Sequence, residues 1–238
     1  MIEKLKHILL TYLLVVQLSI ISSATFSIIV IDPRTKEIGI AGASCTHSVY
    51  GIGAIVPGKG AIVVQAMSNG LARMEGFRMI MEGATAIEII EKIREPYYRP
   101  EMQQYAILCM NDINHPATYT GKENITYAGA LTANGISVQG NTLTSSRVLQ
   151  EIFDAAVKAQ KDSLPVQDIL MIAMEAGARA GGDKRCGKRS ASSAFITVSK
   201  QDDLEKHWLN LVINSTDDHT PAVAALRRKF DKWKSKKK

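Results

Sequence analysis

The residues best placed to do chemistry lie near the start of the chain, in the stretch Ser22-Ser23-Ala24-Thr25. The small residues before Thr25 suit a signal peptidase, and cleavage after Ala24 would make Thr25 the first residue. A threonine at a free amino terminus carries a nucleophilic hydroxyl and, in its own amine, a base. Because an α-amino group titrates near about 7.7 to 8.0, part of it is neutral at physiological pH, and no histidine is required.

The segment before Thr25 has the pattern of a removable export signal. Lys4 and Lys6 precede an apolar run at residues 8–21, which is shorter than the roughly 20 apolar residues that a membrane-spanning helix needs. We therefore expect a signal peptide at 1–24, a secreted or periplasmic mature protein, and no stable membrane insertion after processing. The alternative is a retained anchor, which would keep the Thr25 amine in a peptide bond and remove the base.

Composition indicates one globular enzyme-like domain. Of the 238 residues 46% are hydrophobic and only 6% aromatic, so the core must be built from aliphatic side chains. The formal net charge is +6, and much of it lies near the C-terminus. We expect a domain at 25–233 and a solvated basic tail at 234–238. Nucleic acid is not an expected partner, because an exported protein with no binding motif gives no reason for one.

The cysteines and histidines do not indicate a metal site or a cofactor. The five histidines are scattered, no pair of Cys or His has ligand spacing, and His47 is expected to make only an ordinary hydrogen bond. Cys109 lies in an apolar run and is predicted to be a core residue. Cys45 and Cys186 both lie beside glycine-rich segments, and whether they pair stays open at this point.

The elements that must position these residues alternate in groups of strands and pairs of helices. Strands are predicted at residues 25–31, 37–43, 51–56, 61–66, 104–110, 117–120, 136–139, 191–198 and 208–213, and helices after Asn69 and at 85–94, 145–160, 165–179 and 221–233. Strands grouped in hairpins favour antiparallel sheets over alternating βαβ units. The predicted fold class is α+β, a four-layer αββα sandwich with helices outside two stacked antiparallel sheets.

Six short motifs, in chain order, resemble those of the uncharacterised family DUF1028. They are Thr25-Phe26-Ser27-Ile28-Ile29, Gly39-Ile40-Ala41, Gly51-Ile52-Gly53-Ala54, Gln65-Ala66, Val138-Gln139-Gly140-Asn141, and Gly181-Gly182-Asp183 with Ser190-Ala191. Each motif alone is common, but six in the same order are specific. The resemblance extends from residue 25 to about residue 213.

This resemblance implies a fold similar to the N-terminal nucleophile (Ntn) hydrolases and hydrolysis of an amide bond. The expected substrate is an unknown small-molecule or peptide amide, and assembly into a homo-oligomer is expected by analogy. The alternative function is non-catalytic: a protein that keeps the sandwich and uses its cleft to bind a ligand. Fold alone does not choose between the two functions.

Within this scheme Thr25 is the expected nucleophile, with Asn69 and Asn141 as donors to the tetrahedral oxyanion. Such donors are worth roughly 10²- to 10³-fold in rate. The alternative is that Asn69 only caps a helix and Asn141 only forms a turn.

Five further residues at strand ends and glycine-rich turns are candidate substrate-binding residues. They are Ser44, Gln65, Gln139, Asp183 and Arg185. Asp183 and Arg185 are predicted to orient the amine or to bind a carboxylate substrate, since an arginine fork suits planar anions. Equally, these two side chains could pair only with each other.

Overall fold

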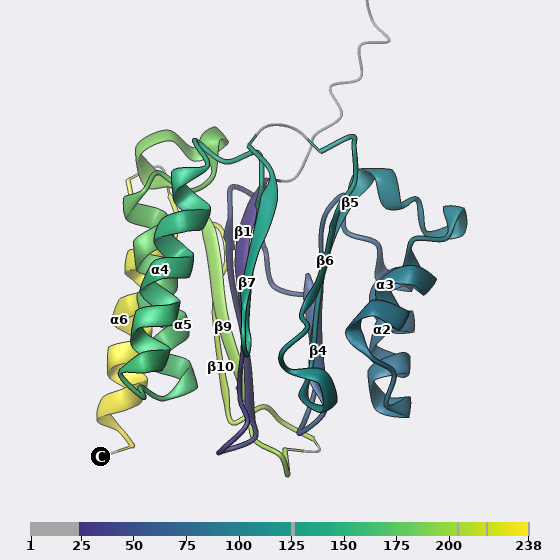
Figure 1. Cartoon of the computed structure of the whole chain (residues 1–238). Helices are drawn as coiled ribbons and strands as arrows, with labels where there is room; N and C mark the ends of the chain where they lie inside the picture. Colours follow the sequence, from purple (N-terminus) through teal and green to yellow (C-terminus); the bar gives the residue numbers. More distant parts are fainter. Residues whose placement is uncertain (1–23, 125–126, 204, 218, 238) are drawn as a thin grey trace, which may run out of the picture.

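Two sheets face each other in the centre of the protein, and helices cover the outer face of each (Figure 1). The computed structural model describes residues 24–124, 127–203, 205–217 and 219–237. The predicted signal peptide therefore lies outside the described residues except for Ala24. In the described part of the chain no helix is long and apolar enough to cross a membrane.

Both sheets are antiparallel throughout, which confirms an α+β sandwich of two antiparallel sheets. The six-stranded sheet has the order β10-β9-β2-β1-β8-β7, and the four-stranded sheet has the order β3-β4-β5-β6. The strands are β1 Thr25–Asp32, β2 Glu37–Ser44, β3 Gly53–Val56, β4 Gly60–Ala66, β5 Gln103–Cys109, β6 Ala117–Thr120, β7 Gly129–Ala133, β8 Ile136–Asn141, β9 Ser193–Ser199 and β10 Leu209–Ile213.

Strand β1 occupies the interior of the six-stranded sheet, between β2 and β8. Thr25 pairs with Ser44 of β2 on one side and with Asn141 of β8 on the other. The next strand, β9, brings Ser193 beside Ser44. Four strand ends from distant parts of the sequence thus meet at the end of the sandwich where β1 begins.

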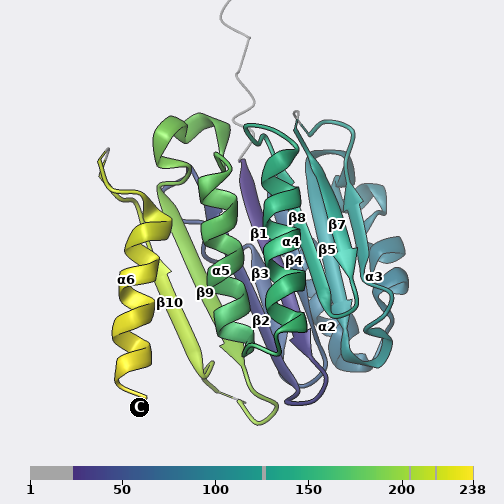
Figure 2. The same cartoon turned by 60° about the vertical axis from the view of Figure 1, so that its left-hand side comes forward.

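Helices α4 (Arg147–Lys161), α5 (Val166–Arg179) and α6 (Ala222–Ser235) cover the six-stranded sheet (Figure 2). The larger apolar core lies between them and the sheet, and its residues include Phe26, Ile28 and Val30 from β1. On the other side α2 (Gly70–Glu82) and α3 (Ala86–Ile93) cover the four-stranded sheet. Four short 3₁₀ helices complete the described elements: η1 Pro96–Tyr98, η2 Pro100–Met102, η3 Met110–Asp112 and η4 Lys184–Arg189.

Helix α2 packs on its sheet through small residues. Its buried residues are Ala72, Gly76 and Ile80. A Cβ on Gly76 would lie 2.2 Å from Ile62 Cδ1, so glycine is what lets the helix approach β4 this closely. Larger apolar side chains of the same helix stay on the surface, with Met74 68% exposed.

The predicted elements agree with the structure except at a few places. Strand β7 was not predicted, because its five residues, Gly129–Ala133, are mostly small and only partly buried. In α3 the capping box of Thr85 and Glu88 fixes the start of the helix. The spacing of its apolar residues predicts one buried face made of Ala86, Ile87, Ile90 and Ile93, but the structure buries Ile89 in place of Ile87. Ile87 is 55% exposed.

Candidate active site

Thr25 is the first residue of β1 and lines a cavity of about 300 Å³ at the end of the sandwich. The residue is only 2% exposed. The cavity is lined by Thr25, Thr46, Ser48, Val49, Ile52, Ala66, Met67 and Ser68. Hydroxyl groups and apolar side chains therefore share its wall. Larger hollows of about 520 and 590 Å³ lie along α2 and beside the β9–β10 connection, away from Thr25.

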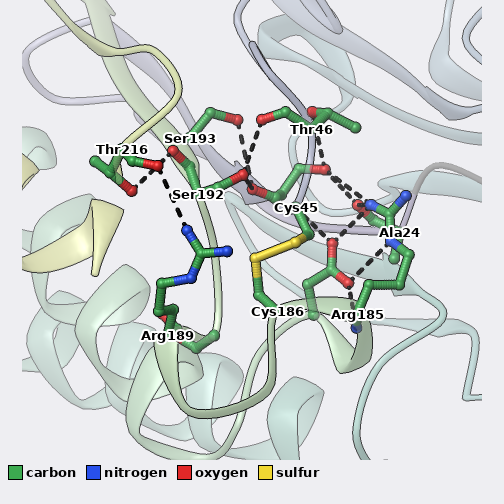
Figure 3. Close-up of a disulfide and its surroundings, with 12 residues drawn as sticks. Ala24, Cys45, Thr46, Arg185, Cys186, Arg189, Ser192, Ser193 and Thr216 are labelled. Carbon is green, nitrogen blue, oxygen red and sulfur yellow. Dashed lines mark hydrogen bonds and ion pairs between the residues drawn. A yellow bond between two sulfur atoms is a disulfide. The ribbon is translucent and has the colours of Figure 1, made fainter. Parts of the chain in front are cut away.

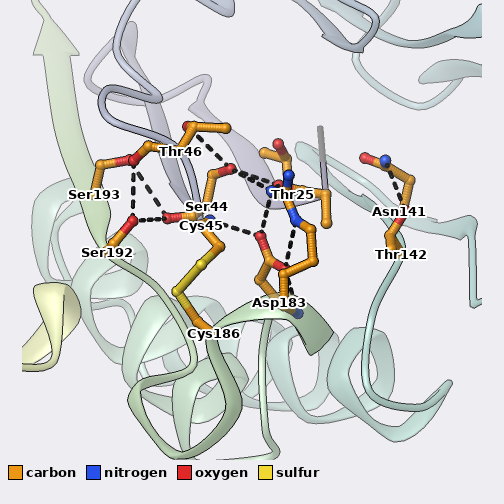
Figure 4. Close-up of polar contacts among 12 residues, drawn as sticks. Thr25, Ser44, Cys45, Thr46, Asn141, Thr142, Asp183, Cys186, Ser192 and Ser193 are labelled. Atoms are coloured by element: carbon orange, nitrogen blue, oxygen red, sulfur yellow. Dashed lines mark hydrogen bonds and ion pairs between the residues drawn. A yellow bond between two sulfur atoms is a disulfide. The ribbon is translucent and has the colours of Figure 1, made fainter. Parts of the chain in front are cut away.

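The carbonyl oxygen of Ala24, the residue before the candidate nucleophile, accepts two hydrogen bonds. Ser44 Oγ donates to it at 2.5 Å, and Arg185 Nη2 donates at 3.1 Å. Thr46 Oγ1 in turn donates to Ser44 Oγ at 3.2 Å (Figure 4). The Ala24–Thr25 peptide bond is thus held by side chains from β2 and from η4.

Asp183 and Arg185 form an ion pair that is anchored to the chain around it. The Arg185 Nη2 and Asp183 Oδ2 atoms are 2.8 Å apart, and the carboxylate also accepts from the backbone N–H groups of Cys45 and Arg185. Asp183 is fully buried, whereas 27% of the Arg185 side chain is exposed. The two residues do pair with each other, but not exclusively, because Arg185 also donates to the Ala24 carbonyl oxygen. Their predicted roles toward the Thr25 amine or a substrate carboxylate stay predictions.

Cys45 and Cys186 form a disulfide next to this ion pair (Figure 3). The bond joins the end of β2 to η4, across 141 residues of sequence. Because Cys45 also donates its N–H to Asp183, the covalent link and the hydrogen bond fix the same two segments together. This answers the question that the sequence left open about these two cysteines.

The loop that carries Asp183 depends on two glycines. Gly181 and Gly182 have φ angles of +112° and +55°, a region that favours glycine. A Cβ on Gly182 would lie 2.6 Å from the Ser190 carbonyl oxygen. Three non-glycine residues at this end also have positive φ: Ala66 (+66°), Thr142 (+52°) and Ser190 (+60°). Such strained backbone is found preferentially at functional sites.

A buried chain of amides and hydroxyls lies beneath Thr25, between the sheets. Ser27 Oγ donates to Gln65 Oε1 and accepts from Gln139 Nε2, each at 2.6 Å. Gln65 Nε2 donates to Gln104 Oε1 at 2.8 Å and approaches the Thr25 carbonyl oxygen at 3.4 Å. All four side chains are 0% exposed. Gln65 and Gln139 thus support β1 from below, and their position gives them no surface toward a substrate.

The two candidate oxyanion donors have different surroundings. Asn141 is buried directly opposite Thr25, with its Nδ2 3.5 Å from Thr142 Oγ1. Asn69 is the N-cap of α2: its Oδ1 accepts from the backbone of Leu71 and Ala72, and its Nδ2 donates to the Tyr98 carbonyl. Its geometry favours the capping alternative over an oxyanion role.

The remaining cysteine and histidine predictions concern residues outside this site. Cys109 is buried, which raises the pKa of its thiol to about 12 and leaves it unreactive. His47 is exposed, and its backbone carbonyl accepts from Ser215. Among the described residues, no three side chains of His, Cys, Asp or Glu gather as metal ligands would.

Sequence reasoning missed Ser27, Thr46 and Gln104 as parts of the site. Gln104 has the most contacts of the three, since its Nε2 reaches Thr120 Oγ1 and the carbonyl oxygens of Gly129 and Gly140. A signal was present for part of this set: Ser27 and Gln65 are polar residues inside runs of apolar strand residues, whereas Gln104 follows Gln103 at the start of its strand and Gln139 lies in a mixed strand. The sequence does not show that these four positions meet.

Fold and site define this protein as an α+β sandwich with a threonine at the first position of a central strand, over a buried polar network. A family described as "Family of unknown function (DUF1028)" matches residues 25–226, and the chain belongs to this family. Among solved structures the chain is similar to the protein SPO2555 from Silicibacter pomeroyi, itself assigned to DUF1028. The TM-score is 0.73 at 24% identity, over 88% of this chain and 89% of that one. No curated protein matches.

Proposed function

We propose that the chain, once it begins at Thr25, is an exported Ntn-type amidohydrolase that cleaves a small-molecule or peptide amide. The observation that carries the proposal is the position of Thr25: it begins a central strand, it lines a cavity, and its main chain is held on both sides. A residue on a rigid strand end is oriented with little conformational freedom, as a nucleophile must be.

The reaction would proceed in two steps. Thr25 Oγ attacks the amide carbonyl carbon while its proton passes to the Thr25 amine and then to the leaving nitrogen, so that the C–N bond breaks and an ester forms. Water then attacks the ester carbonyl, its proton returns through the amine to Oγ, and the acid is released. Asn141, beside Thr25 in the register, is our candidate donor to the oxyanion.

Two features support export and cleavage after Ala24. A disulfide such as Cys45–Cys186 persists in oxidising compartments and is rare in the cytosol. The sequence before Thr25 has the composition of a signal peptide, as described above. Assembly into a homo-oligomer stays a prediction from the family analogy.

The size of the cavity limits the substrate. At about 300 Å³ it is at the lower end of the roughly 300 to 1,000 Å³ that ligand pockets occupy. The part of the substrate that enters the cavity beside Thr25 is therefore a small group. Because the cavity wall carries both hydroxyl groups and aliphatic side chains, it suits a group that is partly polar.

The test compares three chains, and the first residue of each is verified by intact mass. One begins at Thr25, one begins at Ala24, and one begins at residue 25 and carries Thr25→Ala. An amide library is screened for acid release. The chain beginning at Thr25 is expected to turn over a substrate, and both others to lose at least roughly 10³-fold in rate. Thr25→Ser, which keeps a hydroxyl, should retain activity. Equal turnover by the chain beginning at Ala24 would show that the free Thr25 amine is not the base.

One observation favours a second candidate, non-catalytic ligand binding. The Asn69 side chain accepts a hydrogen bond from Leu71 N through Oδ1 and donates one to the Tyr98 carbonyl through Nδ2. One of the two expected oxyanion donors therefore has a structural role. A binding protein would be stabilised by its ligand, and the stabilisation would persist in Thr25→Ala. A thermal-shift screen on both chains distinguishes the two candidates.

A further inference from the structure

The Ala24 carbonyl shows how this site binds an oxygen atom. Its two donors are held in place by groups other than Ala24: Ser44 Oγ accepts from Thr46 Oγ1, and the Arg185 guanidinium binds Asp183 through Nε and Nη2. Asp183 is itself fixed by the Cys45 N–H. The donors would therefore keep their positions after Ala24 leaves, which makes them a preorganised pair.

Cleavage of the Ala24–Thr25 bond changes the charge beside these donors. In the uncut chain the Asp183 carboxylate and the Arg185 guanidinium balance each other. Hydrolysis adds the Thr25 amine, which carries a positive charge when protonated, so the group as a whole gains a net charge of about +1. Two directed donors and a net positive charge in a nearly buried site select an anion over a neutral carbonyl.

The size of the occupant follows from Ala24 itself. The residue is 0% exposed, so the protein encloses its methyl side chain as well as its carbonyl. A ligand that takes its place has room for a carboxylate and a substituent of about the size of a methyl group.

We propose that Ser44 Oγ, Arg185 Nη2 and the Thr25 amine form a carboxylate-binding subsite in the processed protein, which holds small aliphatic carboxylates. The subsite rests on the proposed cleavage after Ala24. Under the proposed hydrolysis it holds the acid that the reaction releases, and a carboxylate there keeps the neighbouring amine protonated. The acid product then inhibits the enzyme by competing with substrate.

Binding of acetate and propionate, measured by calorimetry in a buffer without carboxylates, tests the subsite. The chain beginning at Thr25 is expected to bind them saturably. The chain beginning at Ala24 is the matched control, since Ala24 fills the subsite, and it should bind at least 10-fold more weakly, as estimated from the loss of a charge-assisted bond. Ser44→Ala should weaken binding about 5-fold, and Arg185→Lys about 10-fold because the planar fork is lost.

Equal acetate affinity in the chains that begin at Thr25 and Ala24, or no binding to the chain that begins at Thr25, would overturn the subsite. The readout is separate from turnover. A Thr25→Ala chain that begins at residue 25 keeps its amine, so it should bind acetate and release no acid from amides. Acetate binding without any turnover in the amide screen would support the subsite and contradict the hydrolase. Turnover without acetate binding or inhibition would support the hydrolase and contradict the subsite.

Discussion

The layer between the two sheets has a polar half and an apolar half, and the two halves differ although strands β1, β4 and β5 contribute to both. The polar half lies beneath Thr25 and consists of Ser27, Gln65, Gln104, Ser137 and Gln139. The apolar half lies farther along the same strands and consists of Ile29, Ile31, Ile38, Ile40, Ala61, Val63, Ala106 and Leu108. All of these residues are buried.

The difference shows that stability and positioning come from different parts of one interface. Apolar burial is non-directional and contributes about 25 cal/mol per Å² removed from water, so the apolar half stabilises the sandwich with little control over individual atoms. A hydrogen bond contributes only about 1 kcal/mol net, but it requires a defined geometry. We infer that the polar half fixes the main chain of β1 at Thr25, and the predictions below test that division.

The largest effect on stability is expected from Gln104→Leu in the polar half. The substitution leaves Gln65 Nε2, Thr120 Oγ1 and the carbonyl oxygens of Gly129 and Gly140 without this partner. Each buried group left unsatisfied costs about 1 to 3 kcal/mol, so we expect a loss of about 3 to 5 kcal/mol in the free energy of unfolding. Urea unfolding measures it. Activity per folded molecule should also fall, and unchanged activity would contradict the positioning role.

Leu108→Ala, on the same strand but in the apolar half, is the matched substitution. Leu108 is fully buried, and its truncation should cost about 2 to 4 kcal/mol through lost transfer free energy and a cavity. Activity per folded molecule should stay within about twofold of the wild type. If this variant loses activity as strongly as Gln104→Leu does, then the two halves do not differ in the way we describe.

The disulfide beside the polar half is expected to contribute somewhat less to stability than Gln104. Replacing Cys45 and Cys186 together by serine should lower the free energy of unfolding by about 2 to 4 kcal/mol, the typical contribution of a disulfide. Since the bond also fixes the segment that carries Asp183, carboxylate binding should weaken too. Calorimetry with acetate, beside a melting curve, separates the two effects, and unchanged acetate affinity would show that hydrogen bonds alone hold the loop.

The smallest effect is expected at the end of the apolar half, where His207 Nδ1 lies 2.5 Å from Ser199 Oγ. Burial lowers the pKa of His207 below its ordinary value near 6.5. The unfolded chain therefore binds the proton more readily, so this contribution to stability is complete above about pH 6.5 and is lost as the pH falls below it. We therefore expect a small fall in the melting temperature when the pH is lowered from above 6.5 to 5. Melting curves of His207→Gln at both pH values should show a smaller loss, and an equal loss would assign the effect to another group.

Local patterns were enough to predict most of the fold. Turn residues such as Asp32-Pro33-Arg34 and the capping box of Thr85 and Glu88 set the ends of elements through contacts between near neighbours. Strand β7 was not predicted, because it has few buried apolar residues and depends on pairing with β8. The α+β class followed from the grouping of strands, which reflects chain connectivity more than any single residue.

The site was less predictable, because its parts meet only through the tertiary fold. Thr25, Ser44, Asn141 and Asp183 were identified from their places at strand ends and in glycine-rich turns, and the structure brings them to one end of the sandwich. Sequence spacing could not reveal that Gln65 and Gln139 point into the sheet interface. Asn69 illustrates a second difficulty. Asparagine suits both a helix N-cap and an oxyanion donor, so the residue type alone does not distinguish the two roles.

The interior place of β1 has a consequence for how the protein folds as it is synthesised. Strands β1 and β2 are the first to emerge and can pair at once as a hairpin. Their outer neighbours, β8 and β9, are made much later, so both edges of the hairpin stay open while most of the chain is still being produced. Such long-range pairing is slow, and open strand edges invite aggregation. The strand that begins with Thr25 is thus among the first to form and among the last to gain all its neighbours. Substitutions that slow the folding of the second half of the chain should lower the yield of soluble protein, even where they leave the folded molecule unchanged.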